Sequence, residues 1–291
     1  MPTTNMGLFA PETAASFSAI DISLLLGAVA RCTGAAAAIL KGQPPNWDRV
    51  HNPFAQLPHQ PSPSSGYAVT LGDFFERRFS KRGRKTFARN ERKLSDAGPL
   101  SFGWAETRDE TLTLLDTFFA QRSRQFAAMG VEDIFNAHAR AFYREVALLE
   151  DDNPARFRLG YVKLGDDVLP TFNVVGCHDR MIAVSASLAE GEMQKYSPGN
   201  LLLRHQIEEA CRKGFAYYDI GVGAAAYKDQ WCDVIQPLVD SFIALKPQGL
   251  FATVPLSGAA RVKRAIKSNP HLWQLAQRVR MRLFGKDASS S

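Results

Sequence analysis

The chain has 291 residues, of which 45% are hydrophobic and 22% charged, and its formal net charge at pH 7 is +6. This length allows one large domain or two smaller ones with a sizeable core, and the composition is ordinary for a soluble globular protein. The four cysteines include no CxxC pair. This spacing argues against a zinc site or a disulfide framework, so we expect free thiols in a reducing cytoplasm and no metal.

The positive charge is concentrated in two segments. Residues 76–93 hold nine Lys or Arg and two Glu, and residues 261–286 hold eight Lys or Arg and no acid. The remainder of the chain is net acidic. Basic segments of this kind attract nucleic acid, anionic lipid or phosphorylated ligands, and the alternative is that they are solvated helix faces.

The first apolar stretch, residues 20–40, predicts a helix over 20–30 and a strand or second helix over 35–40. Asp21 and Arg31 interrupt this stretch, so it lacks the run of about 20 apolar residues that a membrane span needs. No positively charged segment precedes it, which argues against a signal peptide. We therefore expect a cytoplasmic protein.

A proline-rich segment, residues 42–66, follows and is predicted to be an extended linker. It leads to a possible strand at 67–70 and to a helix that contains Phe75 and Phe79. Gly83 is predicted to break this helix, and a second, basic helix is expected over 84–96.

The middle of the chain alternates between strand and helix patterns. A strand is predicted at 100–107, a helix at 109–129 and a second helix from apolar spacings of three and four between Ala139 and Leu149. Three strands joined by short polar turns come next, at 157–163, 168–177 and 181–188. This order predicts an α+β fold with a mixed central sheet.

The stretch from Tyr196 to Trp231 is expected to form a loop, a helix, a strand and a second loop. Ser197 and Pro198 are favourable residues for starting a helix, and Gly214 for ending it. An aromatic strand is predicted at 215–220, then a short turn or helix at 224–232, a strand at 238–245, and a helical tail divided at Pro270.

The start of this helix predicts an anion site. Gly199 has no side chain, so a ligand can approach the main-chain amides of Gly199, Asn200 and Leu201 closely, with Ser197 beside them. Unpaired amides and the helix dipole favour an anion such as a pyrophosphate. The alternative is that Ser-Pro-Gly only begins a helix.

Several motifs occur together in a recognisable order: NPFAQLP at 52–58, KTFARNERKL at 85–94, QRSRQF at 121–126, and SPGNLLL, GFAYYDIGVG and AYKDQW between 197 and 231. Over roughly residues 45 to 255 the chain resembles the CelD/BcsL-type acyltransferases. These are GNAT-superfamily proteins associated with polysaccharide and cellulose biosynthesis, related to the Fem-type aminoacyltransferases. The resemblance implies a GNAT-like sheet flanked by helices, with acetyl-CoA or another acyl-CoA as co-substrate.

The resemblance also implies a domain division. In the family a complete GNAT-like lobe precedes the NPF motif, so residues 1–66 are expected to hold a remnant of that lobe and the linker. Residues 67–257 would form the acyltransferase domain, and residues 258–291 a basic helical tail.

Three residues near the predicted 215–220 strand are catalytic candidates. Asp219, inside an apolar strand, could accept the proton of the acceptor, or it could instead bind amides of the following loop. Tyr227 could protonate a departing thiolate, because a phenol with a pKa of about 10 can donate to a thiolate whose thiol has a pKa of about 8.5. Lys228 could hold a phosphate or an oxyanion. The alternatives are that Tyr227 packs and that Lys228 is solvated.

Two further residues are candidates for substrate binding. Arg122 matches the family position and could bind an anionic acceptor or a phosphate, or form a salt bridge with Glu132 or Asp133. His178 could contact the substrate, or be a turn residue. The resemblance also places the donor to the thioester carbonyl on the predicted 181–188 strand, where GNAT folds splay two strands apart.

The leading hypothesis is an acyltransferase that moves an acyl group from coenzyme A to an amine or hydroxyl of a sugar or polysaccharide precursor. A Fem-like transferase that uses aminoacyl-tRNA is the second hypothesis, because both basic segments suit RNA phosphates. The third is a non-catalytic scaffold whose basic tail docks on an anionic membrane surface or an acidic partner.

Overall fold

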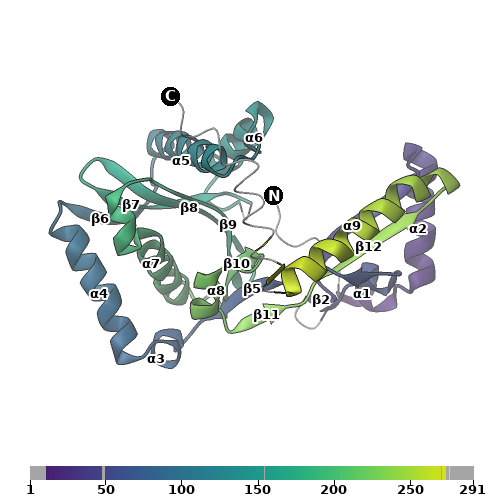
Figure 1. The fold of residues 1–291 in the computed structure, drawn as a ribbon, viewed down its shortest axis with the longest axis horizontal. Helices are drawn as coiled ribbons and strands as arrows, with labels where there is room; N and C mark the ends of the chain where they lie inside the picture. The colour runs from purple at the N-terminus through teal and green to yellow at the C-terminus, as the bar shows by residue number, and fades with distance from the viewer. Residues whose placement is uncertain (1–10, 48–49, 154, 270, 273–274, 276–291) are drawn as a thin grey trace. The chain divides into compact units, whose positions relative to one another are not determined.

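The computed structural model describes residues 11–47, 50–153, 155–269, 271–272 and 275 (Figure 1). These residues belong to two compact units. The first unit is drawn from Met1–Tyr67, Gly221–Gln230 and Val234–Arg278, and the second from Ala68–Ile220, Trp231–Asp233 and Val279–Ser291. The predicted break at Pro270 and most of the predicted tail lie outside the described residues.

A mixed sheet forms the centre of the second unit. From β5 onward its strands lie in the order β5 (Gly66–Thr70), β10 (Tyr217–Val222), β9 (Arg180–Leu188), β8 (Asp167–Cys177), β7 (Arg158–Leu164) and β6 (Leu100–Trp104). Strands β6 to β9 pair antiparallel, whereas β9 and β10 pair parallel. The predicted α+β fold with a mixed sheet is confirmed.

Helices cover both faces of this sheet (Figure 1). On one face, α5 (Arg108–Ala128) and α6 (Ala137–Ala147) pack an aromatic cluster against the strands. On the other face lies α7 (Pro198–Arg212), next to α4 (Lys81–Ser95). The alternation of side chains along β7 sends Leu159 to the first face and Leu164 to the second. The aromatic cluster contains Phe118, Phe119, Phe126, Phe135, Tyr143 and Phe157.

The break between the two basic helices differs from the prediction. Helix α3 (Phe74–Arg78) ends before Phe79, and α4 runs through Gly83 without interruption. The Ser80 hydroxyl caps α4 by accepting the Gly83 amide at 3.2 Å. A cap at Ser80 therefore sets the helix start, and the prediction of a break at Gly83 was wrong because capping outweighed the weak helix propensity of glycine.

The first unit contains a smaller sheet in the order β1 (Ala37–Gln43), β12 (Val239–Ala244) and β4 (Gln60–Pro61). Helix α2 (Ala19–Thr33) begins with a capping box and packs Ile22 and Leu26 against this sheet. Residues 37–43 therefore form the strand that the sequence left open between strand and helix. The unit also holds α1 (Pro11–Ser16) and α9 (Leu250–Ser268).

The proline-rich segment is not the open linker that its composition predicts. It contains β2 (Asn46–Trp47), β3 (Val50–His51), the 3-10 turn η1 (Pro53–Gln56) and β4. The fully buried Asn52 holds it together, because its amide nitrogen donates to the Gln43 side chain and the Pro44 carbonyl at 3.1 and 2.9 Å. Prolines shape this segment, and an internal hydrogen-bond anchor fixes it.

The remaining elements complete the two units. They are η2 (Glu192–Tyr196), α8 (Ala226–Trp231), β11 (Val234–Gln236) and η3 (Pro247–Gly249). Helix α9 already begins at Leu250, ahead of the predicted tail boundary at 258. Among the described helices, none combines the length and apolar character needed to cross a bilayer.

Candidate active site

The parallel pair β9–β10 separates soon after it begins. Three residue pairs are in register, and the last joins Asp219 to Ile182. Beyond this pair β9 continues to Leu188 and β10 to Val222, and the described residues show no further pairing between these two strands. On the side of β9 that faces β10, the main-chain groups beyond Ile182 therefore have no cross-strand partner in the described residues, and such groups are available to bind a ligand.

A bulge lies in β9 along this gap in the β9–β10 pairing. In the antiparallel ladder with β8, Ala183 faces Val174 and Ser185 faces Asn173, so Val184 is an extra residue without a cross-strand partner. A bulge of this kind bends a strand and redirects its groups, and bulges are common beside active sites. Residues 183–188 follow the last pair with β10, and they belong to the 181–188 strand that was predicted to supply a donor to the substrate carbonyl.

The beginning of α7 differs from the prediction in its hydrogen bonds. Ser197 has a left-handed backbone (φ 53°), and its side chain makes no capping bond. Its carbonyl accepts from the amides of Asn200 and Leu201 at 3.0 and 3.2 Å. Two of the three amides predicted to be available for an anion are thus already bonded, because the tight turn at Ser197 brings its carbonyl over the first helical turn.

Gly199 provides the remaining amide of the three. A Cβ atom at this position would lie 2.9 Å from the Leu188 Cδ2 atom, so the end of β9 packs directly against the glycine. The α7 start therefore fits a pyrophosphate less well than predicted, since it offers one of the three predicted amides.

Arg122 lies at the same end of the sheet. Its Nη1 donates to the Gln125 side chain at 2.9 Å, and the Gln125 amide donates to the Leu188 carbonyl at 3.1 Å. The guanidinium carbon lies 4.5 Å from the ring centre of Phe126. These contacts connect Arg122 to the last residue of β9 and hold its side chain in a defined position.

The charge of Arg122 is not neutralised by an ion pair within the described residues. The predicted partner Asp133 instead accepts from the Ser123 hydroxyl at 2.5 Å and pairs with Arg140 at 3.4 Å. The Nε atom of Arg122 is buried and has no acceptor in the described chain. Burial lowers the pKa of Arg122, and the more distant Asp133 offsets this only in part. A half-buried cation without a carboxylate is a candidate anion site.

Asp219 is 5% exposed and occupies the last register position before the gap. Its neighbour Tyr218 points to the α7 face, where its hydroxyl donates to Gln206 at 2.6 Å. Side chains alternate along a strand, so Asp219 points to the opposite face of β10. The amide of Gly223, one of the alternative partners predicted for Asp219, donates to the Ser65 carbonyl.

Tyr227 and Lys228 lie on α8 and belong to the first unit. Lys228 is buried, and its Nζ donates to the carbonyls of Gly221 and Val222 at 2.9 and 3.5 Å. It also lies 5.2 Å from the ring centre of Tyr67. Lys228 is therefore not solvated as the alternative supposed, and it fixes the turn after β10. Tyr227 is 39% exposed.

His178 is exposed in the β8–β9 turn, with φ 51°. It precedes Arg180, where β9 and β10 are still in register. The gap begins after Ile182 and runs away from this turn, so the fold does not bring His178 to the gap. Of the predicted residues in the second unit, the structure gathers Gly199 and Arg122 near the end of β9, with Asp219 where the gap opens.

Residues 81–229, which include the separating strands and α7, match the acetyltransferase (GNAT) domain family. The chain belongs to this family. No curated protein matches the chain significantly.

Solved structures share the fold at low sequence identity. The C-terminal domain (DUF2156) of a protein assigned as a lysylphosphatidylglycerol synthetase from Agrobacterium fabrum is 13% identical, with a TM-score of 0.54 over 82% of this chain and 76% of that chain. L-PGS from Bacillus licheniformis is 11% identical, with a TM-score of 0.54 over 82% of this chain and 76% of that chain. FemX is 12% identical, with a TM-score of 0.55 over 80% of this chain and 79% of that chain. At such identities the likeness shows the fold alone.

Three residues of the GNAT domain site were not predicted from the sequence. Val184 forms the bulge, Gln125 links Arg122 to β9, and Leu188 packs on Gly199. The QRSRQF motif contained the signal for Gln125, which follows Arg122 by three residues and so shares its helix face. Val184 and Leu188 depend on strand pairing, which no local motif reveals. Within the described residues, no group of three His, Cys, Asp or Glu side chains could hold a metal ion.

Proposed function

We propose that the chain is a GNAT-type acyltransferase that moves an acyl group from acyl-CoA to an amine or hydroxyl of a sugar or polysaccharide-related acceptor. The observation that carries this proposal is the separation of β9 from β10 directly after Asp219. A gap between two strands exposes main-chain donors in fixed directions, and fixed donors stabilise the oxyanion of an acyl-transfer intermediate. The acceptor class rests on the resemblance of the sequence motifs.

The transfer would use main-chain and side-chain groups of the chain itself. An amide N–H of residues 183–188 donates to the acyl carbonyl oxygen, and the acceptor nitrogen or oxygen attacks the carbonyl carbon. Asp219 takes the proton from the attacking atom. The C–S bond then breaks, the acyl group stays on the acceptor, and the thiolate takes a proton to leave as the thiol. Tyr227 is the proposed donor of that last proton, whereas the Lys228 ammonium positions the turn after β10 through its bonds to the Gly221 and Val222 carbonyls.

Positive charge near α7 would hold the phosphates of the donor. The α7 start contributes the single amide of Gly199, and Arg122 contributes a cation at the end of β9. Helix α4 contacts both η2 and α7, and its exposed Arg89 and Arg92 have no ion-pair partner in the described chain. Phosphate binding would therefore depend more on side-chain cations and less on main-chain amides than the sequence suggested.

Calorimetric titration of the full chain with acetyl-CoA tests this proposal, together with an assay of thiol release in the presence of amino sugars. We expect binding that saturates below millimolar ligand. Asp219→Asn should retain donor binding and lose about 100-fold in turnover, the lower range for removing a general base. No binding at millimolar acetyl-CoA would contradict the proposed donor.

A second donor, aminoacyl-tRNA, is favoured by one observation: the α7 start offers one of the three predicted amides, whereas α4, which contacts α7, exposes a row of bases. Such a row suits an extended phosphate backbone. A gel shift with tRNA at 50 and 200 mM salt distinguishes the two donors. Binding that weakens steeply with salt, and that is reduced by Arg89→Gln and Arg92→Gln, would support the RNA donor.

A further inference from the structure

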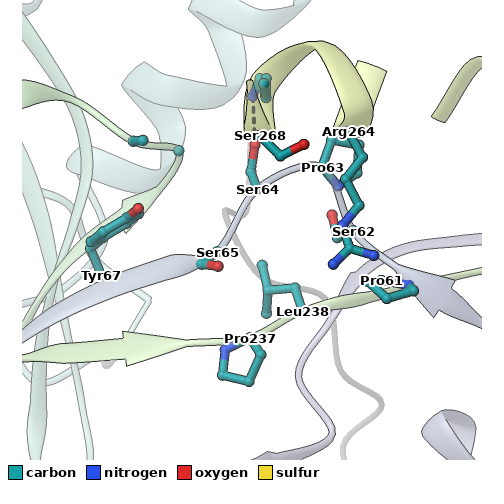
Figure 2. Close-up of a pocket in the computed structure, with 13 residues that line it drawn as sticks. Pro61, Ser62, Pro63, Ser64, Ser65, Tyr67, Pro237, Leu238, Arg264 and Ser268 are labelled. Atoms are coloured by element: carbon teal, nitrogen blue, oxygen red, sulfur yellow. Dashed lines mark hydrogen bonds between the residues drawn. The ribbon is translucent and has the colours of Figure 1, made fainter. Parts of the chain in front are cut away.

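The first unit contains a cavity of about 480 Å³ between the proline-rich segment and α9 (Figure 2). All of its lining residues belong to this unit. They come from the 61–67 segment, the 223–224 turn after β10, the stretch before β12, and the last turns of α9. The volume lies within the range of about 300–1,000 Å³ that is typical of small-molecule sites.

Two cations line this cavity from α9. Figure 2 shows Arg264 extending from the helix toward Ser62 and Pro63, and a hydrogen bond reaching Ser64. The donor of that bond is the Lys267 ammonium, at 2.6 Å from the Ser64 hydroxyl oxygen. A serine that accepts from a lysine still has its own proton, so the Ser64 hydroxyl can donate a hydrogen bond to a ligand while it accepts one from Lys267.

The serine hydroxyls supply further donors. Ser62 and Ser65 are half-buried and line the cavity, and neither hydroxyl has a hydrogen-bond partner in the described chain. Their main-chain groups are already used, because the Ser62 amide donates to the Leu238 carbonyl and the Ser65 carbonyl accepts from Gly223. These backbone bonds fix the segment, and the hydroxyl groups remain available to a ligand.

The lining of the cavity contains two bases and no acid. Helix α9 also contains no Asp or Glu. Arg264 has neither an ion pair nor a hydrogen bond within the described residues. Burial, followed by the neighbouring charge of Lys263, lowers the pKa of Lys267. The surroundings therefore disfavour the Lys267 cation, and a bound anion would relieve this penalty.

The rest of the wall is apolar and stiff. Pro61, Pro63 and Pro237 restrict the backbone on two sides, and Leu238 is 3% exposed. The side chain of Tyr67 lines the cavity as well. Such a wall suits the organic part of a ligand, whereas the bases and hydroxyls suit its anionic group.

We propose that this cavity binds a small phosphorylated organic molecule, whose phosphate is held by Arg264, Lys267 and the hydroxyls of Ser62, Ser64 and Ser65. A phosphate presents several acceptor oxygens and needs donors from more than one direction. The guanidinium group provides a planar pair of donors, and the ammonium group a compact charge. The site does not depend on acyl transfer, because none of its residues has a part in that chemistry.

Calorimetric titration of the full chain with glucose 1-phosphate tests the site, and glucose serves as the unphosphorylated control. We expect saturable binding of the phosphate ester and none of the free sugar. Arg264→Gln should weaken binding at least tenfold, the loss expected for a charge-assisted bond. Ser64→Ala should weaken it less, because Lys267 remains.

Lys263→Gln is the matched control. It removes the same charge from the same helix, but Lys263 is exposed and does not line the cavity. We expect it to change affinity less than threefold. An equal loss in Lys263→Gln and Arg264→Gln would show only diffuse attraction to a basic helix and would overturn the proposal. So would binding that is lost in Gly199→Ala but unchanged in Arg264→Gln, which would place the probe at α7.

Discussion

Serine residues have opposite roles in the two units. In the second unit the Ser187 hydroxyl donates to Gln121 at 2.6 Å and lies 2.8 Å from the Thr171 hydroxyl, and all three residues are buried. The Gln121 amide in turn donates to the Val168 carbonyl. This closed network fastens β9 to α5 near the gap. In the first unit the hydroxyls of Ser62 and Ser65 have no partner in the described chain.

The two sets of serines therefore differ in function, since one set positions a strand and the other can bind a ligand. A satisfied network in the interior fixes the strand that borders the reaction gap, because each broken bond would leave a buried polar group. Unsatisfied donors beside a cavity are useful only when a ligand arrives. The two units also differ in packing, since the second has a buried aromatic cluster whereas α9 of the first exposes large apolar side chains.

The largest predicted effect contrasts two phenylalanines. Phe118 is fully buried in the aromatic cluster, and Phe251 on α9 is 86% exposed. Phe118→Ala should lower the free energy of unfolding by about 3–5 kcal/mol, because it leaves a cavity among five other rings. Phe251→Ala should change it by less than about 0.5 kcal/mol. Urea unfolding followed by circular dichroism measures both. A similar loss from both variants would mean that α9 is covered in solution.

Two glycines test the packing of the first unit. A Cβ on Gly249 would lie 2.0 Å from the Ala36 carbonyl oxygen, which is main chain and cannot rotate away, whereas a Cβ on Gly258 meets nothing within 4 Å. Gly249→Ala should destabilise the protein by about 3 kcal/mol through overpacking. Gly258→Ala, inside α9, should stabilise it by about 0.5–1 kcal/mol through helix propensity. Thermal unfolding compares them. If Gly249→Ala were neutral, the close approach of Ala36 would be wrong.

Local patterns predicted most elements of the second unit. The apolar spacing over 109–129 and the polar turns between 157 and 188 specify their helix and strands without reference to distant residues. The β9–β10 gap also followed from the family resemblance. The bulge at Val184 did not, because it exists only in the pairing with β8.

The first unit was harder to predict because its pairing is long-range. Strand β1 pairs with β12, about 200 residues later, and no short motif encodes that contact. The composition of the 42–66 segment indicates a linker, whereas Asn52 organises it through its hydrogen bonds. The number of main-chain amides available to an anion at the start of α7 was predicted too high for a related reason. The left-handed turn at Ser197, which uses two of the amides, depends on the preceding η2 turn.

Arg122 offers a test in which stability and binding change in opposite directions. Arg122→Met removes a half-buried cation that no carboxylate pairs within the described chain, so it should stabilise the fold by up to about 1 kcal/mol. The same change should weaken acetyl-CoA binding about tenfold if Arg122 holds an anionic group of the donor. Calorimetry and thermal unfolding report the two effects. Arg124, exposed on the same helix, supplies the control Arg124→Met. If Arg122 had only a structural role, Arg122→Met would lower the free energy of unfolding and leave the affinity for acetyl-CoA unchanged.

The smallest predicted effect concerns His205, whose ring stacks on Phe102 at a centroid distance of 3.7 Å. Burial lowers the pKa of His205, and the nearby Glu208 offsets this only in part. The unfolded chain binds this proton near pH 6.5, whereas the folded chain binds it only at lower pH. The unfolded state therefore holds more protons as pH falls below 6.5, and stability falls with it.

His205→Phe should reduce this loss of stability. Between pH 7.5 and 5.5 the variant should lose less unfolding free energy than the wild type, by about 1 kcal/mol or less. Urea unfolding at three pH values measures the difference. At pH 7.5 the two proteins should be nearly equally stable, because phenylalanine preserves the stacking on Phe102. If the variant lost as much stability on acidification as the wild type, the proton uptake would belong to another group, and the α7 face of the sheet would not exclude a charged imidazole.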